Sequence, residues 1–329
     1  MLQVKNYPLG FYPTPLHQVN NFSSSIGNYR VYIKRDDQTG LATGGNKTRK
    51  LEYLIGDALS RGADTIITAG AQQSNHCRQT AAACAVAGLH CHLLLRGDPP
   101  AQTNGNLLLS RMLGATIHFN AADKKGPGLE TLSEELTKKG HKPYIVPYGG
   151  SNITGAMGYV QAAGELKQQL EREKLSVDYI FFASSSGGMQ AGLTLGMELY
   201  GLRSELMPVS IDKEDIGETL LEEKIHELLR EGKDNLKLQK TFSKQDVPLI
   251  RDFNKAGYGV ITDKEKEAIS TLARLEGIIL DPVYTARAFY GMMYYLRNNL
   301  IKPGSTVLFW HTGGIPANFS YAGELSNNS

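Results

Sequence analysis

Short apolar runs alternate along the chain with longer stretches that have a helical pattern. The runs occupy residues 65–70, 90–95, 116–120, 144–150, 178–184, 206–211 and 306–314. Between them, the Ala-rich segment 74–89 and the segment 107–115 read as helices, and each has near its end a Gly that suits a helix C-cap. Because strands that alternate with helices pair through right-handed crossovers, the pattern predicts an α/β protein with parallel sheets.

The length of the chain favours two domains, since 329 residues exceed the roughly 100 to 200 residues of a usual domain. We expect a smaller domain at residues 49–160, inserted into a larger domain made of residues 1–48 and 161–329. The segment from Lys213 to Lys244 is rich in Glu, Lys and Leu, which predicts surface helices in the larger domain.

Composition and charge exclude several classes of protein. Lys and Arg number 35 against 33 Asp and Glu, and no long basic stretch marks a nucleic-acid surface. The N-terminus lacks the pattern of a signal peptide, and no run approaches the roughly 20 apolar residues of a membrane span. We therefore expect a cytosolic protein that binds neither nucleic acid nor membrane. Cys77, Cys84 and Cys91 are odd in number and clustered, which favours reduced thiols over disulfides. They form no CxxC pair, so we expect buried thiols and no metal site.

Lys47 is the first candidate for chemistry. It follows an apparent strand and a Gly-rich turn, and it stands at the start of a helical pattern. The positive end of a helix disfavours an ammonium group, so the neutral amine that can form a Schiff base becomes easier to reach. Residues 40–48 nearly spell a phosphate-binding P-loop, but the inserted Asn46 argues against it. The alternative is that Lys47, Arg49 and Lys50 merely solvate the start of a helix.

A second candidate is the loop of Ser and Gly residues after the apolar run 178–184. Ser184–Gly188 separates that predicted strand from a helix that begins near Met189. Unpaired amides at a helix start bind phosphate, and glycines let the backbone approach its oxygens closely. No lysine follows the loop and no GxGxxG is present, so a monophosphate fits better than a nucleotide. A plain turn is the alternative.

Polar residues also follow the predicted strand at 65–70, where ligands collect in α/β proteins. Gln73, Ser74, Asn75 and His76 lie there, at the start of the Ala-rich helix. An Asn amide can donate to a phenolic oxygen, and a Ser hydroxyl with neighbouring amides can hold a substrate carboxylate. N-capping of the helix by Ser74 or Asn75 is the alternative.

Three further groups lie where loops gather, and structural roles are open for each of them. They are Tyr258 in GYGV, Tyr284 with Thr285 in DPVYTARA, and His311 with Thr312 in WHTGG.

Taken in order, these motifs resemble one known family. The segments KRDD, GGNKTRKLE, SNH, RQT, PYGGSN, SSSGG, GYG, LDPVYT and HTGG are similar to those of the D-cysteine desulfhydrase and aminocyclopropane carboxylate deaminase family, over about residues 10–320. The resemblance implies the two-domain fold of the tryptophan synthase β subunit, in which each domain is an open, mostly parallel sheet flanked by helices. It also implies pyridoxal phosphate bound between the domains, and usually a homodimer.

The resemblance implies roles for individual residues as well. Lys47 would carry the cofactor covalently, Asn75 would contact its phenolic oxygen, and Ser74 would meet the substrate. The cofactor phosphate would be held by Ser185, Ser186, Gly187, Gly188 and Met189. Tyr258 and Tyr284 would orient cofactor and substrate, Thr285 and Thr312 would contact the cofactor, and Gln73 and His76 would complete the substrate site.

Two positions favour the desulfhydrase branch. Cyclopropane-opening members carry Glu and Leu where this chain has Thr285 and Thr312. A neutral Thr beside the pyridine nitrogen cannot keep it protonated, so the ring is a weaker electron sink. That sink suffices for β-elimination, in which the leaving group removes the charge. The expected reaction therefore turns D-cysteine into pyruvate, ammonia and hydrogen sulfide.

The chain departs from the family pattern at Met189, usually Thr, and at Ala286 and Arg287, usually Gly-Lys. These departures bear on phosphate affinity and substrate choice. The alternatives on the same scaffold are an L-cysteate sulfo-lyase, an aminocyclopropane carboxylate deaminase and a non-catalytic protein that binds pyridoxal phosphate. A P-loop nucleotide hydrolase is the alternative from another class.

Overall fold

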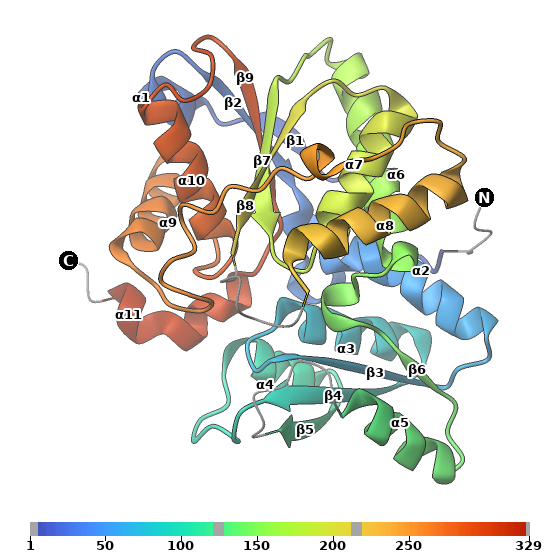
Figure 1. Ribbon diagram of the computed structural model, residues 1–329. Helices are drawn as coiled ribbons and strands as arrows, with labels where there is room; N and C mark the ends of the chain where they lie inside the picture. Colours follow the sequence, from blue (N-terminus) through green and yellow to red (C-terminus); the bar gives the residue numbers. More distant parts are fainter. Residues whose placement is uncertain (1–5, 121–127, 212–218, 327–329) are drawn as a thin grey trace.

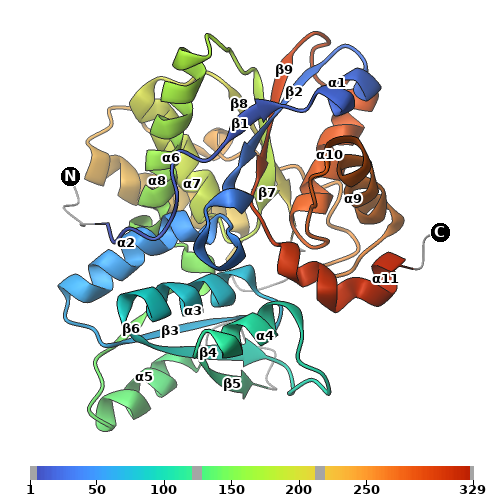
Figure 2. The same ribbon diagram turned by 180° about the vertical axis from the view of Figure 1, so that it is seen from behind.

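The computed structural model describes residues 6–120, 128–211 and 219–326. In this part of the chain the strands form two sheets, one of five and one of four strands. Figure 1 shows the two sheets in different parts of the molecule, with α2 and α3 between them. The same arrangement is seen from behind in Figure 2.

The larger sheet has the strand order β1-β2-β9-β7-β8. Its strands are β1 (Leu16–Gln18), β2 (Arg30–Arg35), β7 (Tyr179–Ser184), β8 (Glu205–Ser210) and β9 (Thr306–His311). β1 pairs antiparallel with β2, and the other neighbours are parallel. Every residue of the central strand β9 is buried, as expected for a strand covered by helices on both faces.

The smaller sheet has the order β5-β4-β3-β6 and is parallel throughout. Its strands are β3 (Thr65–Ala71), β4 (His90–Arg96), β5 (Thr116–Asn120) and β6 (Pro143–Ile145). Side chains of β4 alternate between its faces, so Cys91 and Leu93 pack with α2 and α3, whereas Leu94 packs with α5.

The helices cover both sheets and connect their strands. They are α1 (Asn20–Ile26), α2 (Lys47–Ser60), α3 (Asn75–Ala87), α4 (Gly105–Met112), α5 (Leu129–Lys138), α6 (Ile153–Arg172), α7 (Gly188–Tyr200), α8 (Leu221–Leu236), α9 (Asp263–Glu276), α10 (Thr285–Arg297) and α11 (Ala322–Ser326). Short 3-10 turns lie at Asp36–Gln38, Leu41–Thr43, Tyr148–Gly150, Lys244–Asp246 and Ile315–Tyr321.

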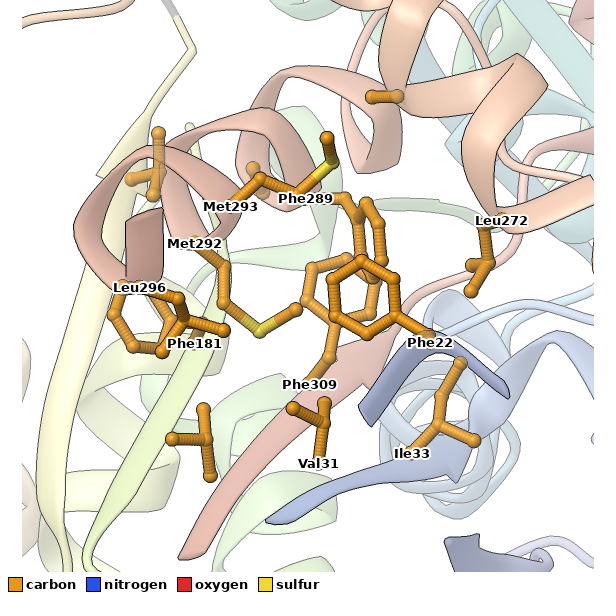
Figure 3. Packing of buried hydrophobic residues seen from close by; sticks show 14 of the residues in the cluster. Phe22, Val31, Ile33, Phe181, Leu272, Phe289, Met292, Met293, Leu296 and Phe309 are labelled. Carbon is orange, nitrogen blue, oxygen red and sulfur yellow. The ribbon is translucent and has the colours of Figure 1, made fainter. Parts of the chain in front are cut away.

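A core of aromatic and aliphatic side chains joins α1, α9 and α10 to the larger sheet (Figure 3). Phe289 of α10 lies between Phe22 and Phe309, with ring centroids 4.9 and 5.0 Å away. Phe309 belongs to β9, so this core fixes α10 and its N-cap residue Tyr284 against the strand that ends beside Thr312.

Glycines bring α2, α6 and α7 close together. A Cβ on Gly158 of α6 would lie 2.1 Å from the carbonyl oxygen of Arg49 in α2, and one on Gly192 of α7 would lie 2.3 Å from that of Ala156. Larger residues do not fit at these contacts. The close packing therefore fixes the N-terminal ends of α2 and α7 relative to each other.

A buried ionic network also fixes α2. Arg49 donates to both oxygens of Asp36, at 2.8 Å each, and to Glu165 of α6. Lys34 of β2 bonds to Glu165 as well. Burial alone raises the pKa of Asp36, but the Arg49 guanidinium outweighs it and leaves that pKa below its usual value. The network therefore holds the helix that begins at Lys47 between β2 and α6.

The strands expected at 65–70, 90–95, 116–120, 178–184 and 206–211 are confirmed within one residue. Two expected runs are too long: the strand at 144–150 ends at Ile145, before a turn at Tyr148–Gly150, and the strand at 306–314 ends at His311. Pro147 lacks an amide hydrogen, and Gly149 and Gly313 have positive φ, which does not suit a strand.

Helices were predicted less completely than strands. α3 ends at Gly88 in the left-handed conformation, as expected, but α4 ends at Met112, before Gly114. α8 confirms a helix between Lys213 and Lys244, although residues 213–218 lie outside the described part of the chain. The pattern did not reveal α5, α6, α9 or α10. The expected domain boundaries at 49 and 160 fall inside α2 and α6, so that division stays a prediction.

Candidate active site

A pocket lies where the N-terminal ends of α2, α3 and α7 meet the C-terminal ends of β7 and β9. It contains about 630 Å³ of empty space, part of it open to solvent. Helix N-termini favour anions, and ligands of α/β proteins collect at the carboxyl ends of strands. Ten of the predicted site residues line the pocket: Lys47, Ser74, Asn75, His76, Ser185, Ser186, Gly187, Met189, Tyr284 and Thr312.

Lys47 is the first residue of α2, and the backbone around it is bonded to two other elements. The amide of Asn46 donates to the carbonyl of Thr312, after β9, at 3.0 Å. The amide of Thr48 donates to Oε1 of Gln79, in α3, at 2.9 Å. These two bonds fix the start of α2 at the wall of the pocket, and the Lys47 side chain is partly exposed there.

The loop at Ser184–Gly188 has the geometry expected of a phosphate cradle. Gly187 has φ +83°, a conformation that favours glycine, and α7 begins at the next residue. Ser151 fixes the loop, because its hydroxyl lies 2.8 Å from that of Ser186 and accepts from the amide of Gly188 at 3.2 Å. Gly188 therefore supports the loop, although its atoms do not line the pocket.

Lys50 is a pocket residue that sequence reasoning missed. Its side chain is 1% exposed, and its ammonium donates to Gly149 O at 3.0 Å and to Ser151 Oγ at 2.9 Å, two neutral acceptors. Burial lowers its pKa well below the usual value, and Lys47 adds to that effect. Helix solvation is thus the wrong interpretation for Lys50. Its spacing of three residues from Lys47, which places both on one helix face, is the signal that could have revealed it.

Lys50 makes the cradle suited to an anion. A Cβ on Gly188 would lie 2.9 Å from Lys50 Nζ, so the ammonium lies at the N-terminus of α7. A cation at the positive end of a helix, with neutral partners, is unfavourable unless an anion joins them. A phosphate group would pair with the Lys50 ammonium and accept hydrogen bonds from the amides of the loop.

The N-terminus of α3 brings three more of the predicted residues into the pocket. Ser74 is the N-cap and accepts from the amide of Cys77 at 3.2 Å, so capping is confirmed, and its hydroxyl hydrogen can still be donated. Asn75 lines the pocket, and its Oδ1 accepts from Asn106 Nδ2 at 2.9 Å, so its amino group is the part of the amide that could donate to a ligand. Gln73 lies outside the lining residues, and its side chain bonds to Asn104 and Asn106.

His76 is neutral and forms part of the pocket wall. The Thr68 hydroxyl donates to Val146 O at 2.8 Å, so it accepts from His76 Nε2 at 2.9 Å. Nδ1 is therefore the unprotonated nitrogen, and it is buried without a hydrogen-bond partner among the described residues. Burial, together with Lys47 and Lys50, lowers the pKa of His76 well below its usual value.

At the other side of the pocket, Tyr284 lies in the wall and Tyr258 lies behind it. Their hydroxyl oxygens are 2.6 Å apart. Thr285 does not line the pocket, because its hydroxyl donates to Asp281 Oδ1 at 2.6 Å. A contact between Thr285 and a cofactor ring stays a prediction.

Met189 and His311 have structural partners. Met189 Sδ accepts from Asn46 Nδ2 at 3.8 Å, a contact between the starts of α7 and α2. His311 Nε2 lies 3.1 Å from Ile279 O, and His311 Nδ1 accepts a hydrogen bond from the amide of Gly313. Across residues 6–120, 128–211 and 219–326, neither a cluster of metal-ligating side chains nor a helix long and apolar enough to span a membrane is found.

Pyridoxal phosphate fits this set of groups. Its aldehyde needs an amine, which Lys47 could supply, and its phosphate needs amides and a cation, which the Ser184–Gly188 loop and Lys50 could supply. Its phenolic oxygen needs a donor, which the Asn75 amino group could supply.

Known proteins are similar to this chain in sequence and in fold. The D-cysteine desulfhydrase of Klebsiella pneumoniae (strain 342) is 41% identical over 319 residues, which is 95% of each chain. The crystal structure of an ACC deaminase homologue has a TM-score of 0.89 at 38% identity and covers 98% of this chain and 96% of that chain. An O-ureido-L-serine synthase, at 12% identity, covers 98% and 95% with a TM-score of 0.69, which shows the shared fold.

These similarities agree with the expected fold and cofactor. The model of the family described as "Pyridoxal-phosphate dependent enzyme" matches residues 7–313, which include Lys47, the Ser184–Gly188 loop and Thr312. The geometry of the pocket and the match over nearly the whole chain lead to one conclusion: the chain belongs to the family of pyridoxal-phosphate dependent enzymes.

Proposed function

We propose that the protein breaks the Cβ–S bond of D-cysteine, with pyruvate, ammonia and hydrogen sulfide as products. The observation that carries the proposal is that Lys47 and the Ser184–Gly188 loop, far apart in the sequence, line one pocket together with Lys50. The near-full-length similarity to a D-cysteine desulfhydrase supports the choice of substrate.

Five groups of this chain would hold the cofactor. Lys47 Nζ would bind it covalently, and Asn75 would donate to its phenolic oxygen. The amides of Ser185, Ser186, Gly187 and Met189, together with the Lys50 ammonium, would bind the phosphate, while the Gly188 amide stays bonded to Ser151. Thr312 would lie against the ring. When bound, pyridoxal phosphate supplies an electron sink for the carbanion at the substrate Cα.

The same residues account for the expected bond changes. The Ser74 hydroxyl, which accepts from Cys77, would donate its hydrogen to the substrate carboxylate, and the amides at the start of α3 would add to this contact. Lys47 Nζ, once displaced by the substrate amine, would remove the proton from Cα. The Cβ–S bond then breaks and its electron pair leaves with sulfur. Addition of one water releases pyruvate and ammonia.

The neutral groups near the pocket favour elimination over ring opening. Thr285 and Thr312 carry no charge that could keep a pyridine nitrogen protonated, and Thr285 is already bonded to Asp281. A weaker electron sink suffices when sulfide leaves with the electron pair, whereas an unactivated cyclopropane needs a stronger one.

The test uses the purified holoprotein. D-cysteine, L-cysteine, L-cysteate and aminocyclopropane carboxylate are added separately, and pyruvate, oxobutyrate and sulfide are measured. We expect pyruvate and sulfide from D-cysteine. Pyruvate without sulfide from L-cysteate would identify a sulfo-lyase, and oxobutyrate from aminocyclopropane carboxylate would identify a deaminase. A protein that absorbs visible light but turns over none of the four would favour a binding role.

Replacement of Lys47 tests its covalent role. Lys47→Ala should lose the visible absorbance of the lysine-bound cofactor and lower kcat by at least about 1000-fold, because both attachment and proton removal depend on this amine. Lys139→Ala, which changes an exposed lysine next to α5, is the matched control and should keep both properties. A Lys47→Ala protein with full turnover would overturn the assignment.

A homodimer and a cytosolic location belong to the same proposal. Cys77, Cys84 and Cys91 are buried free thiols, which suits a reducing compartment. Sedimentation equilibrium should give twice the mass of the 329-residue chain, and cell fractionation should recover the protein with cytosolic markers. A monomer, or recovery with membranes, would contradict the corresponding part.

A further inference from the structure

Arg287 is a buried arginine that the proposed reaction does not use. It lies on α10, three residues after Tyr284, and it is 1% exposed. Its Nε donates to Glu265 Oε1 at 2.7 Å, and its two terminal nitrogens donate to three backbone carbonyls. A buried guanidinium that is bonded in this way holds separate segments of chain in one geometry.

The carbonyls identify which segment is held. Nη1 donates to Gly257 O at 3.0 Å and Nη2 to Val260 O at 2.8 Å, so the two terminal nitrogens bind the backbone on both sides of Tyr258. Gly257 and Gly259 have φ of +95° and +74°, so the loop has a conformation that its other residues would rarely adopt. The guanidinium thus holds the loop that carries Tyr258.

Glu265 fixes the guanidinium in turn. One carboxylate oxygen accepts from Arg287, and the other accepts from the amide of Thr262 at 2.9 Å as part of the capping box of α9. Both ionic side chains are nearly fully buried, with 1% and 3% exposure. The start of α9 is therefore linked through Arg287 to the Tyr258 loop.

Tyr258 connects this loop to the pocket through its contact with Tyr284. Its hydroxyl lies 2.6 Å from that of Tyr284, which lines the pocket, and the two rings meet edge to face with centroids 5.8 Å apart. Tyr284 is also the N-cap residue of α10, so Tyr284 and Arg287 project from the same helix end. The two tyrosine hydroxyls keep their distance only while the loop and this helix end stay in place.

We propose that Arg287, fixed by Glu265, is a positioning residue that holds the Tyr258 hydroxyl against the Tyr284 hydroxyl at the wall of the pocket. Through this pair it sets the orientation of Tyr284 toward the substrate; the catalytic part of the inference rests on the proposed function. Lysine cannot replace the arginine here, because a single ammonium cannot bind Glu265 and reach carbonyls on both sides of Tyr258.

The test compares Arg287→Lys with two other variants in the holoprotein. Arg287→Lys keeps the charge opposite Glu265, so the fold should survive. Tyr258→Phe removes the hydroxyl that the loop presents. Arg297→Lys is the matched control, since Arg297 lies on the same helix and pairs with Glu267 of α9, but in an exposed position. The double variant Arg287→Lys/Tyr258→Phe completes a double-mutant cycle.

Two readouts separate this inference from the proposed function. Amide hydrogen exchange of peptides that span residues 254–262 should become at least about tenfold faster in Arg287→Lys and stay unchanged in Arg297→Lys. With D-cysteine, kcat should fall about tenfold in Arg287→Lys while KM changes less than about threefold, and the double variant should be no slower than Tyr258→Phe.

Unchanged exchange in Arg287→Lys would overturn the inference, whether or not D-cysteine is a substrate. Effects of Arg287→Lys and Tyr258→Phe on kcat that multiply would also overturn it, because they would mean that Arg287 does not act through the Tyr258 hydroxyl. If the protein acts on another of the four amino acids, the proposed substrate fails, and the same cycle with that amino acid tests the inference.

Discussion

Lys50 shows at the scale of one residue how burial changes the role of a side chain. Next to Lys47 and Arg49 in the sequence, it resembles part of a solvated helix start. In the structure its ammonium is buried at the N-terminus of α7 with neutral partners. That environment favours a bound anion, because the anion would offset both the buried charge and the positive end of the helix.

Replacement of Lys50 should therefore weaken cofactor binding without unfolding the protein. Lys50→Met removes a charge-assisted contact to phosphate, commonly about 1.5–3 kcal/mol, which corresponds to a rise in the Kd for pyridoxal phosphate of about 10- to 150-fold. Titration of the cofactor-free protein measures this change. Lys139→Met serves as the exposed control. Equal affinity in Lys50→Met and the unaltered protein would show that Lys50 does not bind the phosphate.

At the scale of elements, the packing of α7 against α6 depends on small residues. Gly192→Ala would place a Cβ 2.3 Å from Ala156 O and 2.5 Å from Tyr159 Cβ, so the helices would have to separate. Overpacking of this kind costs about 1–3 kcal/mol. Urea denaturation should show that loss for Gly192→Ala. Gly323→Ala, which adds a Cβ in open space on α11, should stay within about 0.5 kcal/mol.

A pair of neighbouring histidines, one on β4 and one on β5, should make the stability of the protein depend on pH. His92 Nδ1 lies 3.0 Å from His118 Nε2, and burial, followed by the neighbouring histidine, lowers the pKa of His92 to about 4. The unfolded chain takes up this proton near pH 6.5, whereas the folded protein does not until about pH 4. The contribution of His92 to stability is therefore complete above pH 6.5 and falls as the pH is lowered toward 4.

His92→Gln should remove that part of the pH dependence. Urea midpoints measured at pH 7.5 and pH 5 should differ less in the variant than in the unaltered protein. The measurement at pH 7.5 is the internal control for any loss of packing. The same difference in both proteins would contradict the assignment to His92.

At the scale of the whole molecule, the network of Lys34, Asp36, Arg49 and Glu165 joins β2 and α2 to α6, which is distant from both in the sequence. Asp36 is fully buried and also accepts from Tyr159 and Thr14. The network thus determines where α2 starts, and hence where Lys47 lies relative to α7.

Asp36→Asn should destabilise the protein by about 3–5 kcal/mol, because the buried cations Lys34 and Arg49 would then share the single carboxylate of Glu165. The visible absorbance of the lysine-bound cofactor should fall as well, since α2 carries Lys47. Glu267→Gln, in an exposed ion pair with Arg297, is the control and should stay within about 0.5 kcal/mol. Chemical denaturation and absorbance together test both effects.

The sequence by itself determined most of the strands, the class of fold and the pocket motifs. Buried strands such as β3 and β7 are short, continuous apolar runs, and the Ser184–Gly188 loop is a local signal that can be read without the fold. Lys47 could be predicted for the same reason: it stands at a helix start that its own neighbours define.

Tertiary structure alone decided which polar groups work together. Lys50 became a pocket residue because α7 begins beside it. Arg287 became a link between α9, α10 and the Tyr258 loop. The contacts of Lys50 and Arg287 join residues far apart in the chain, and their strength comes from burial, which local sequence patterns do not encode.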